Sequence, residues 1–565
     1  LDIRQFAADL INADDAPQSF IYNFYDALRS VTILDPTCGS GAFLFAAMNI
    51  LEPLYYDCIT RLEGIERKSP DTQKALDEIK SKYRSNIHYF IYKSIILRNL
   101  YGVDIMAEAT EIAKLRLFLK MVAVVDVQPL VDNLGLDPLP DIDFNIRCGN
   151  TLVGYVNAES IVKDHDGDMF AIHDFEENVA AEMDKVARIF KLFKHLQLTQ
   201  ESEHHEEFIA AKHQLRDLLS SLNDTLNHHL HNATASGMPY EEWLNSHQPF
   251  NWVAEFYDII HGNGGFDVII GNPPYVEYSK IRKEYQVTGI KCIDSGNLYA
   301  YVIERTLSFS HKGTRNGMII QMSAFCTPRM ASFQKMYFEN AKFSSIAFFD
   351  DRPGKLFENL QHIRVVIPII EVGMPTSLTA TTGYVKFYSH CRNILFQNIS
   401  YYLSQSSRKA FSVLKIRTAI ENSIAEKVWS MSKTIQCFES CLRNNNYVYY
   451  GYGYGYFGKI LNKKSYFWGE NVKESTGDKY YFINDEYDRD IFVGLLNSSL
   501  FYWFYINFSD GHNFTKTVIG AMPFEYGSCQ RIKQAVEILM LDLEQCKGRK
   551  VCNYKSTGRV EYDEY

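Results

Sequence analysis

Residues 34–43 read Leu-Asp-Pro-Thr-Cys-Gly-Ser-Gly-Ala-Phe, and they hold the clearest fold signal in the chain. The apolar run before them predicts a buried strand that ends at Asp35, and the apolar spacing over residues 42–61 predicts a helix. Glycines in such a turn let the backbone approach a ligand closely, and the helix start offers unpaired N–H groups. The turn lacks the G-x-G-x-x-G spacing, so a tight turn without a ligand fits it as well.

Residues 101–105, Tyr-Gly-Val-Asp-Ile, repeat this arrangement further along the chain. A helical stretch ends near residue 98, a short strand ends at Asp104, and a helix is predicted over 107–125. Strands that alternate with helices favour a parallel sheet. The ligand crevice of such a sheet lies at the carboxyl ends of its strands, so Asp35 and Asp104 are expected to face it. An acid at Asp104 suits the ribose diol of a nucleotide, and equally a helix cap.

Residues 266–275, Phe-Asp-Val-Ile-Ile-Gly-Asn-Pro-Pro-Tyr, carry the most specific chemistry. A buried strand ends there, and two prolines fix φ and remove two N–H donors, which gives a stiff loop with exposed carbonyls. The Asn272 amide oxygen and the Pro273 carbonyl can both accept hydrogen bonds from one amino group, and Tyr275 can stack on the ring that bears it. This arrangement suits an aromatic exocyclic amine, and the alternative is a rigid turn without chemistry.

The three motifs together resemble those of class I, S-adenosylmethionine-dependent N6-adenine DNA methyltransferases. Asp-Pro-Thr-Cys-Gly-Ser-Gly is similar to their cofactor motif, Asn-Pro-Pro-Tyr is similar to their catalytic motif, and the order of the two is that of the gamma group. The layout looks like the methyltransferase and specificity part of type IIG restriction–modification enzymes. The resemblance covers most of residues 31–372 and, more loosely, 430–545.

The resemblance implies a role for each matching residue. The catalytic loop would consist of Asn272, Pro273, Pro274 and Tyr275. The cofactor S-adenosyl-L-methionine would be bound by Asp35, Pro36, Thr37, Gly39, Gly41, Asp104, Ile105 and Asn150, the last standing where the family often has an Asp near the cofactor's adenine. Phe357 would stack with Tyr275 on the target base, and an ordinary core position is the alternative for Phe357. No metal is implied.

The implied reaction is site-specific, adenine-specific methylation of double-stranded DNA within a restriction–modification or phage-defence system. A base inside a duplex cannot reach the methyl donor, so the target adenine is expected to flip out and to leave as N6-methyladenine. A nuclease domain or subunit outside this chain is an expected partner. The recognised DNA sequence is not fixed by any motif.

Composition sets the broad class. The chain has 565 residues and a net charge of −10, which argues weakly against nucleic acid as partner, although a groove can be basic on an acidic body. Its 11 Cys lack a CxxC pair and indicate reduced thiols without disulfides or zinc. No apolar run is long enough for a membrane span. We expect a prokaryotic, cytoplasmic, nucleoid-associated protein. The chain starts without an initiator Met, and we expect it to be a piece of a longer protein.

The predicted architecture is α/β, with a Rossmann-like, mostly parallel methyltransferase domain and a C-terminal α+β target recognition domain. The methyltransferase domain spans 1–156 and 251–372, a helical insertion 157–250, a linker region 373–400, and the recognition domain 401–565. The insertion is expected to be a pair of long helices, whose His-His-Glu-Glu run at 204–207 fits a solvated helix face better than a metal site. Further strands are expected at 318–321, 344–349 and 365–370, a flexible loop or twisted strand pair at 450–456, and a final helix at 530–546.

Three other functions are weighed against this one. A protein-glutamine or RNA methyltransferase could use the same Asn-Pro-Pro-Tyr loop, but such chains are usually shorter. A nuclease would need the Pro-Asp at 70–71 and the Glu-Ile-Lys at 78–80, which lie close together in a segment that looks helical. A DNA-binding specificity subunit without catalysis would need neither Asn272 nor the Gly-rich turn.

Overall fold

The computed structural model describes residues 3–83, 86–125, 139–163, 169–199, 205–234, 237–357, 363–405, 407–454 and 458–565. Two compact units divide the chain. The first comprises residues 1–320, 335–344 and 367–376, and the second comprises residues 321–334, 345–366 and 377–565. The predicted domain boundary at 372 differs from this division, because segments 321–334 and 345–366 belong to the second unit.

The first unit is built on five parallel strands. They are β1 (Ile33–Asp35), β2 (Leu100–Asp104), β3 (Ile146–Cys148), β4 (Phe266–Gly271) and β5 (Ser310–Met318). Their order is β5-β4-β1-β2-β3, and every neighbouring pair is parallel. On the far side of β5, residues 369–371 of β8 (Val365–Val372) pair antiparallel with 315–317. The mixed α/β fold with a mostly parallel sheet is the one that the alternating pattern predicts.

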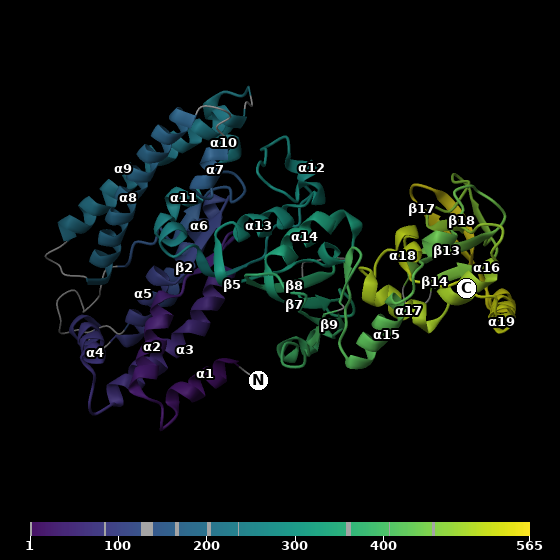
Figure 1. The fold of residues 1–565 in the computed structure, drawn as a ribbon, viewed down its shortest axis with the longest axis horizontal. Coiled ribbons are helices and arrows are strands. Elements are labelled where there is room, and N and C mark those ends of the chain that lie inside the picture. The colour runs from purple at the N-terminus through teal and green to yellow at the C-terminus, as the bar shows by residue number, and fades with distance from the viewer. Residues whose placement is uncertain are drawn as a thin grey trace. The chain divides into compact units, whose positions relative to one another are not determined.

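Helices connect these strands and cover the sheet (Figure 1). Long apolar helices form the core beside β1 and β2: α5 buries most of its residues, and α3 buries one apolar face. The helices of this unit are α1 (Ile3–Asn12), α2 (Gln18–Ser30), α3 (Ala42–Gly64), α4 (Pro70–Tyr83), α5 (Ile87–Arg98), α6 (Ala107–Val122), α7 (Ala158–Lys163), α8 (Met169–Thr199), α9 (His205–Thr234), α10 (Tyr240–His247), α11 (Trp252–Glu255), α12 (Tyr278–Ile281) and α13 (Leu298–Leu307). Most of α14 (Ala331–Glu339) belongs here as well.

The stretch predicted as a helical insertion contains the two long helices α8 and α9, which lie side by side (Figure 1). Leu215, Leu219, Leu222 and Leu226 recur on α9 at helical spacing and are buried. His204 of the His-His-Glu-Glu run lies outside the described residues, and α9 begins at the next residue. In the described part of the chain no group of three or more His, Cys, Asp or Glu side chains could hold a metal ion.

The second unit combines antiparallel strands with helices. The strand β9 (Thr379–Val385) pairs with β10 (Tyr402–Ser404), β13 (Tyr447–Tyr454) lies between β14 (Gly458–Leu461) and β16 (Asp478–Phe482), and β18 (Gly558–Glu564) lies between β15 (Phe467–Gly469) and β17 (Gly548–Tyr554). The two-residue strands β11 (Arg408–Lys409) and β12 (Ser412–Val413) pair with each other. Its helices are α15 (Ala419–Trp429), α16 (Arg489–Leu496), α17 (Ser499–Phe508), α18 (Lys516–Ala521) and α19 (Gln530–Cys546). Apolar and aromatic side chains from these elements form a core of their own.

Several local expectations can be compared with these elements. The helix predicted at 530–546 is α19, and the tyrosine-glycine run begins as strand β13 of a strand pair, although residues 455–457 lie outside the described part. The strands predicted at 344–349 and 365–370 lie within β7 (Ala341–Phe349) and β8. Each of these two strands has residues in both units. The predicted linker region 373–400 contains β9 and the 3-10 helix Ser389–Ile394.

The described residues contain no single helix that is long and apolar enough to cross a membrane. One bent pair, α16 and α17, passes the same length and hydropathy test when its two helices are joined across a 65° bend.

Candidate active site

The Gly-rich turn and the Asn-Pro-Pro-Tyr loop leave the same edge of the sheet. Strands β1 and β4 are parallel neighbours, with Leu34 opposite Ile269, so the turn after β1 and the loop after β4 begin side by side. The approach is close, because a Cβ on Gly271 would lie 2.9 Å from Asp35 Oδ1 and 3.4 Å from Thr37 Oγ1. Gly271 was not singled out in the sequence, and its neighbours explain why no side chain fits there.

The Asp35 carboxyl lies buried at the start of the turn. Its Oδ1 accepts a hydrogen bond of 3.1 Å from the Thr37 N–H. Its Oδ2 and the Thr37 hydroxyl are buried and have no hydrogen-bond partner among the described residues. Burial raises the pKa of Asp35 to about 8; the Thr37 N–H lowers it and the charge of Asp104 raises it. The turn therefore holds polar atoms that a ligand can satisfy.

Two glycines allow the turn to close onto α6. Gly39 and Gly41 have φ of +51° and +76°, a left-handed backbone that other residues rarely adopt. A Cβ on Gly41 would also lie 3.0 Å from the Cβ of Ala113 on α6. Pro36 is buried directly after Asp35, and its carbonyl accepts a hydrogen bond from the Thr151 hydroxyl. Thr151 was missed in the sequence, although it follows Asn150.

Asp104 ends β2 and joins the turn to the next helix. Its Oδ2 accepts a hydrogen bond of 2.8 Å from the Gly39 N–H, and its Oδ1 accepts one of 2.9 Å from the Met106 N–H at the start of α6. The carboxylate thus holds the Gly-rich turn and the residue that precedes α6 in place. Each of its oxygens keeps a further lone pair for a ligand hydroxyl. Ile105 follows with an exposed side chain, 39% accessible, at the same edge.

Asn150 lies in a buried turn after β3. Its Oδ1 accepts from the Leu152 N–H at 3.1 Å, and its own N–H donates to the Gln248 carbonyl at 2.7 Å. Its Nδ2 is buried, and the hydroxyl of Tyr285 is the group that faces it. The side chain of Asn150 is therefore held in place at the carboxyl end of β3.

The Asn-Pro-Pro-Tyr loop presents its amide to solvent and anchors its ring. Asn272 is exposed, and no hydrogen bond engages its side chain within the part of the chain that the structure describes, while Pro273 is buried. Pro274 is exposed between Pro273 and Tyr275. The Tyr275 hydroxyl donates to the Ile319 carbonyl at 3.0 Å, its ring meets Tyr299 edge to face, and burial raises the pKa of that hydroxyl. Tyr275 therefore has a fixed ring beside an unengaged amide.

The predicted base-stacking residue Phe357 belongs to the second unit. It is half-buried in a bend that ends at the last described residue before 363. Its stacking role stays a prediction, since Tyr275 lies in the first unit.

Comparison with known proteins assigns the region that carries this site. Residues 98–357 match the model of the Eco57I restriction-modification methylase family. The matched range holds Asp104, Asn150 and the Asn-Pro-Pro-Tyr loop.

One curated relative is a putative type II restriction enzyme and methyltransferase of Methanocaldococcus jannaschii. It is 31% identical over 292 residues, which make up 45% of this chain and 22% of the relative. The chain therefore spans less than a quarter of that relative's length.

Solved structures with a similar arrangement also come from restriction–modification systems. The type IIL enzyme MmeI in complex with DNA has 10% identity and a TM-score of 0.43, and the match covers 96% of this chain and 68% of MmeI. A modification subunit of a putative type I restriction enzyme from Vibrio vulnificus has 12% identity and a TM-score of 0.30, and the match covers 72% of this chain and 60% of that subunit.

Proposed function

We propose that this chain is a site-specific DNA adenine N6-methyltransferase that uses S-adenosyl-L-methionine and serves a restriction–modification or phage-defence system. The observation that carries the proposal is the juxtaposition at the β1–β4 edge. There the exposed, unengaged amide of Asn272 follows a glycine whose Cβ position lies 2.9 Å from the buried carboxyl of Asp35. The family match over residues 98–357 supports the same reading.

The residues of the turn fit the cofactor. Asp35 Oδ2 and the Thr37 hydroxyl are buried polar atoms that lack partners within the described ranges, so each can bind a polar group of a ligand. A ligand ammonium would favour the charged form of the Asp35 carboxyl, whose pKa burial raises to about 8. Asp104, beside Gly39, is placed to accept from a ribose hydroxyl. When bound, S-adenosyl-L-methionine supplies a methyl group on a positively charged sulfur.

The loop after β4 would prepare the amine that takes up this methyl group. The Asn272 amide oxygen and the Pro273 carbonyl accept hydrogen bonds from the adenine amino group and localise the nitrogen lone pair. The two prolines hold both acceptors in place, so that much of the catalysis comes from positioning. The amine loses its proton after it has become positive, so no strong base is needed beside it.

The target base would be held by aromatic stacking outside the duplex. Tyr275 offers a ring that its hydroxyl bond to Ile319 and its contact with Tyr299 fix in place. Phe357 of the second unit is the proposed second stacking residue. Stacking of one base on an aromatic ring contributes about 1–3 kcal/mol, which offsets the cost of unstacking. Residues 401–565 are the proposed target recognition domain, and a nuclease domain or subunit is the proposed partner.

The experiment is methyl transfer from labelled S-adenosyl-L-methionine to duplex DNA, to structured RNA and to a glutamine-containing protein, with the wild type and Asn272→Ala. We expect label in DNA alone and a loss of at least about 100-fold in Asn272→Ala, since one of two acceptors at the reacting nitrogen is gone. Unchanged cofactor affinity and thermal stability would show that the variant is folded. Label in protein or RNA instead of DNA would assign the chain to those methyltransferases and overturn the proposal.

A further inference from the structure

The helical insertion makes two polar connections to the strand that leads into Asn150. Among the strands of the described residues, β3 is the last at its end of the sheet and pairs with β2. One connection lies before β3 and the other lies after it, and α9 takes part in both. The turn at Asn150 follows β3 within two residues.

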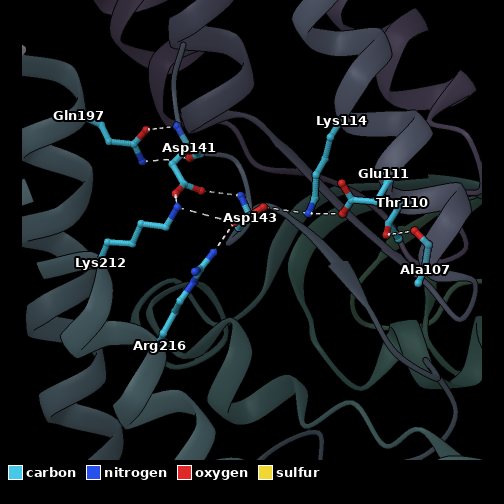
Figure 2. Close-up of polar contacts among 9 residues, drawn as sticks. All are labelled: Ala107, Thr110, Glu111, Lys114, Asp141, Asp143, Gln197, Lys212 and Arg216. Carbon is cyan, nitrogen blue, oxygen red and sulfur yellow. Dashed lines mark hydrogen bonds and ion pairs between the residues drawn. The ribbon is translucent and has the colours of Figure 1, made fainter. Parts of the chain in front are cut away.

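The first connection is an ion cluster before β3 (Figure 2). Lys212 of α9 pairs with Asp141, and Arg216 pairs with Asp143 at 2.6 Å. Lys114 of α6 reaches the other oxygen of Asp143 at 2.9 Å. From α8, Gln197 accepts from the Asp141 N–H at 2.7 Å and donates to its carbonyl at 3.0 Å. Partial burial raises the pKa of Asp143, but Lys114, Lys212 and Arg216 outweigh it and lower that pKa overall, so the charged cluster persists at neutral pH.

The second connection runs after β3 through Asn251, which is fully buried. Its Nδ2 donates to Asn223 Oδ1 at 3.0 Å and to Asn227 Oδ1 at 2.8 Å, both on α9. Its Oδ1 accepts from the Tyr155 N–H at 3.1 Å. Asn223 also donates to Glu255 at 2.7 Å, and Glu255 pairs with Arg147 in β3 itself.

Asn251 therefore joins α9 to the segment that lies against the Asn150 turn. The Asn150 N–H donates to Gln248, the Phe250 N–H donates to Val153 at 2.8 Å, and the Trp252 indole donates to the Thr151 carbonyl at 3.2 Å. Thr151 in turn bonds to the Pro36 carbonyl in the Gly-rich turn. Hydrogen bonds and the short backbone stretches between them therefore connect the insertion to the candidate cofactor site.

We infer that Asn251 is a positioning residue, through which α9 sets the Asn150–Thr151 turn and thereby the affinity for the cofactor. The inference rests on the proposed function for the identity of the ligand. A buried amide that pairs with acceptors on α9 and with a donor at Tyr155 fixes these two segments relative to its own, because leaving any of these groups unpaired costs free energy. The insertion is then part of the cofactor site's support, and its helices are more than a surface addition.

The test compares Asn251→Ala with Leu219→Ala in the same protein. Leu219 is buried on α9 but takes no part in the hydrogen-bond series, so its variant loosens the helix pair by packing alone. Two quantities are measured, namely the hydrogen exchange rate of the Tyr155 amide without ligand and the dissociation constant for S-adenosyl-L-methionine by calorimetry. In Asn251→Ala we expect the exchange rate and the dissociation constant each to rise about tenfold. In Leu219→Ala we expect each to change less than threefold, although the two variants lose the same amount of thermal stability.

A second pair of variants covers the case that Asn251→Ala does not fold. Asn227→Leu removes one acceptor of Asn251, whereas Asn227→Asp keeps an oxygen there. The leucine variant is expected to weaken cofactor binding about threefold or more, with the aspartate variant nearer the wild type.

Equal effects of Asn251→Ala and Leu219→Ala, or equal effects of the two Asn227 variants, would overturn the inference. A wild type that binds no S-adenosyl-L-methionine would refute the proposed function instead. The exchange rates, which need no ligand, would still decide whether Asn251 positions the turn.

Discussion

Gly271→Ala probes the contact between the two loops with a single added methyl group. The new Cβ would lie 2.9 Å from Asp35 Oδ1, whereas an unstrained carbon–oxygen contact is about 3.4 Å, so the loops must separate by roughly 0.5 Å. A misplacement of about 1 Å at reacting groups can lower a rate about 100-fold, so we expect kcat to fall about tenfold. Overpacking of this kind costs about 1–3 kcal/mol of folding stability.

The assay is methyl transfer to DNA at saturating S-adenosyl-L-methionine, with chemical denaturation as the measure of stability. Gly64→Ala is the matched control, because a Cβ at the end of α3 would meet nothing within 4 Å. The control should keep wild-type kcat. A Gly271→Ala protein with wild-type kcat and stability would refute the claim that the two loops are in contact.

Four further variants test three single residues of the site. Burial raises the pKa of Asp35 to about 8, so between about pH 4 and pH 8 the folded state holds a proton that the unfolded chain has released. The stability of the wild type should therefore decline as pH rises through this range, and Asp35→Asn should remove that decline. Thermal unfolding across this range measures it, and equal pH slopes in both proteins would contradict it. Asp104→Ala should raise the dissociation constant for S-adenosyl-L-methionine about tenfold, since the Gly39 N–H loses its acceptor; unchanged calorimetric binding would exclude a brace at Asp104. Tyr275→Phe should lose less than tenfold in methyl transfer, since it lacks only the bond to Ile319, and Tyr275→Ala about 10- to 100-fold, since stacking is lost too. Similar losses in the two Tyr275 variants would argue against stacking.

Local signals allowed the edge of the sheet to be predicted. The turn after Asp35 and the loop after Gly271 are short, and in each an apolar strand is followed closely by proline or glycine residues. Strand β5 was harder, because a strand was predicted at 318–321 and the structure begins it at Ser310. The polar Thr314 and Asn316 are buried in that strand and satisfied by hydrogen bonds to Phe266 and Thr306, which no hydrophobic pattern reveals.

The support of the site could not be predicted for a related reason. Asn251 and Asn223 are 28 positions apart, and Asn251 and Tyr155 are 96 positions apart, so their hydrogen bonds exist only once α9 has packed beside β3. Asn150 itself was found through a resemblance of motifs. The C-terminal pair β17 and β18 was also missed, since β17 is largely exposed and carries no apolar alternation.

The most direct measurement is the identity of the methylated nucleoside. Duplex DNA is incubated with the protein and S-adenosyl-L-methionine, digested to nucleosides and analysed by mass spectrometry, in parallel with Asn272→Ala. The account predicts N6-methyldeoxyadenosine with the wild type and almost none with Asn272→Ala. A methylated cytosine, or the same yield of methyladenine from both proteins, would contradict it.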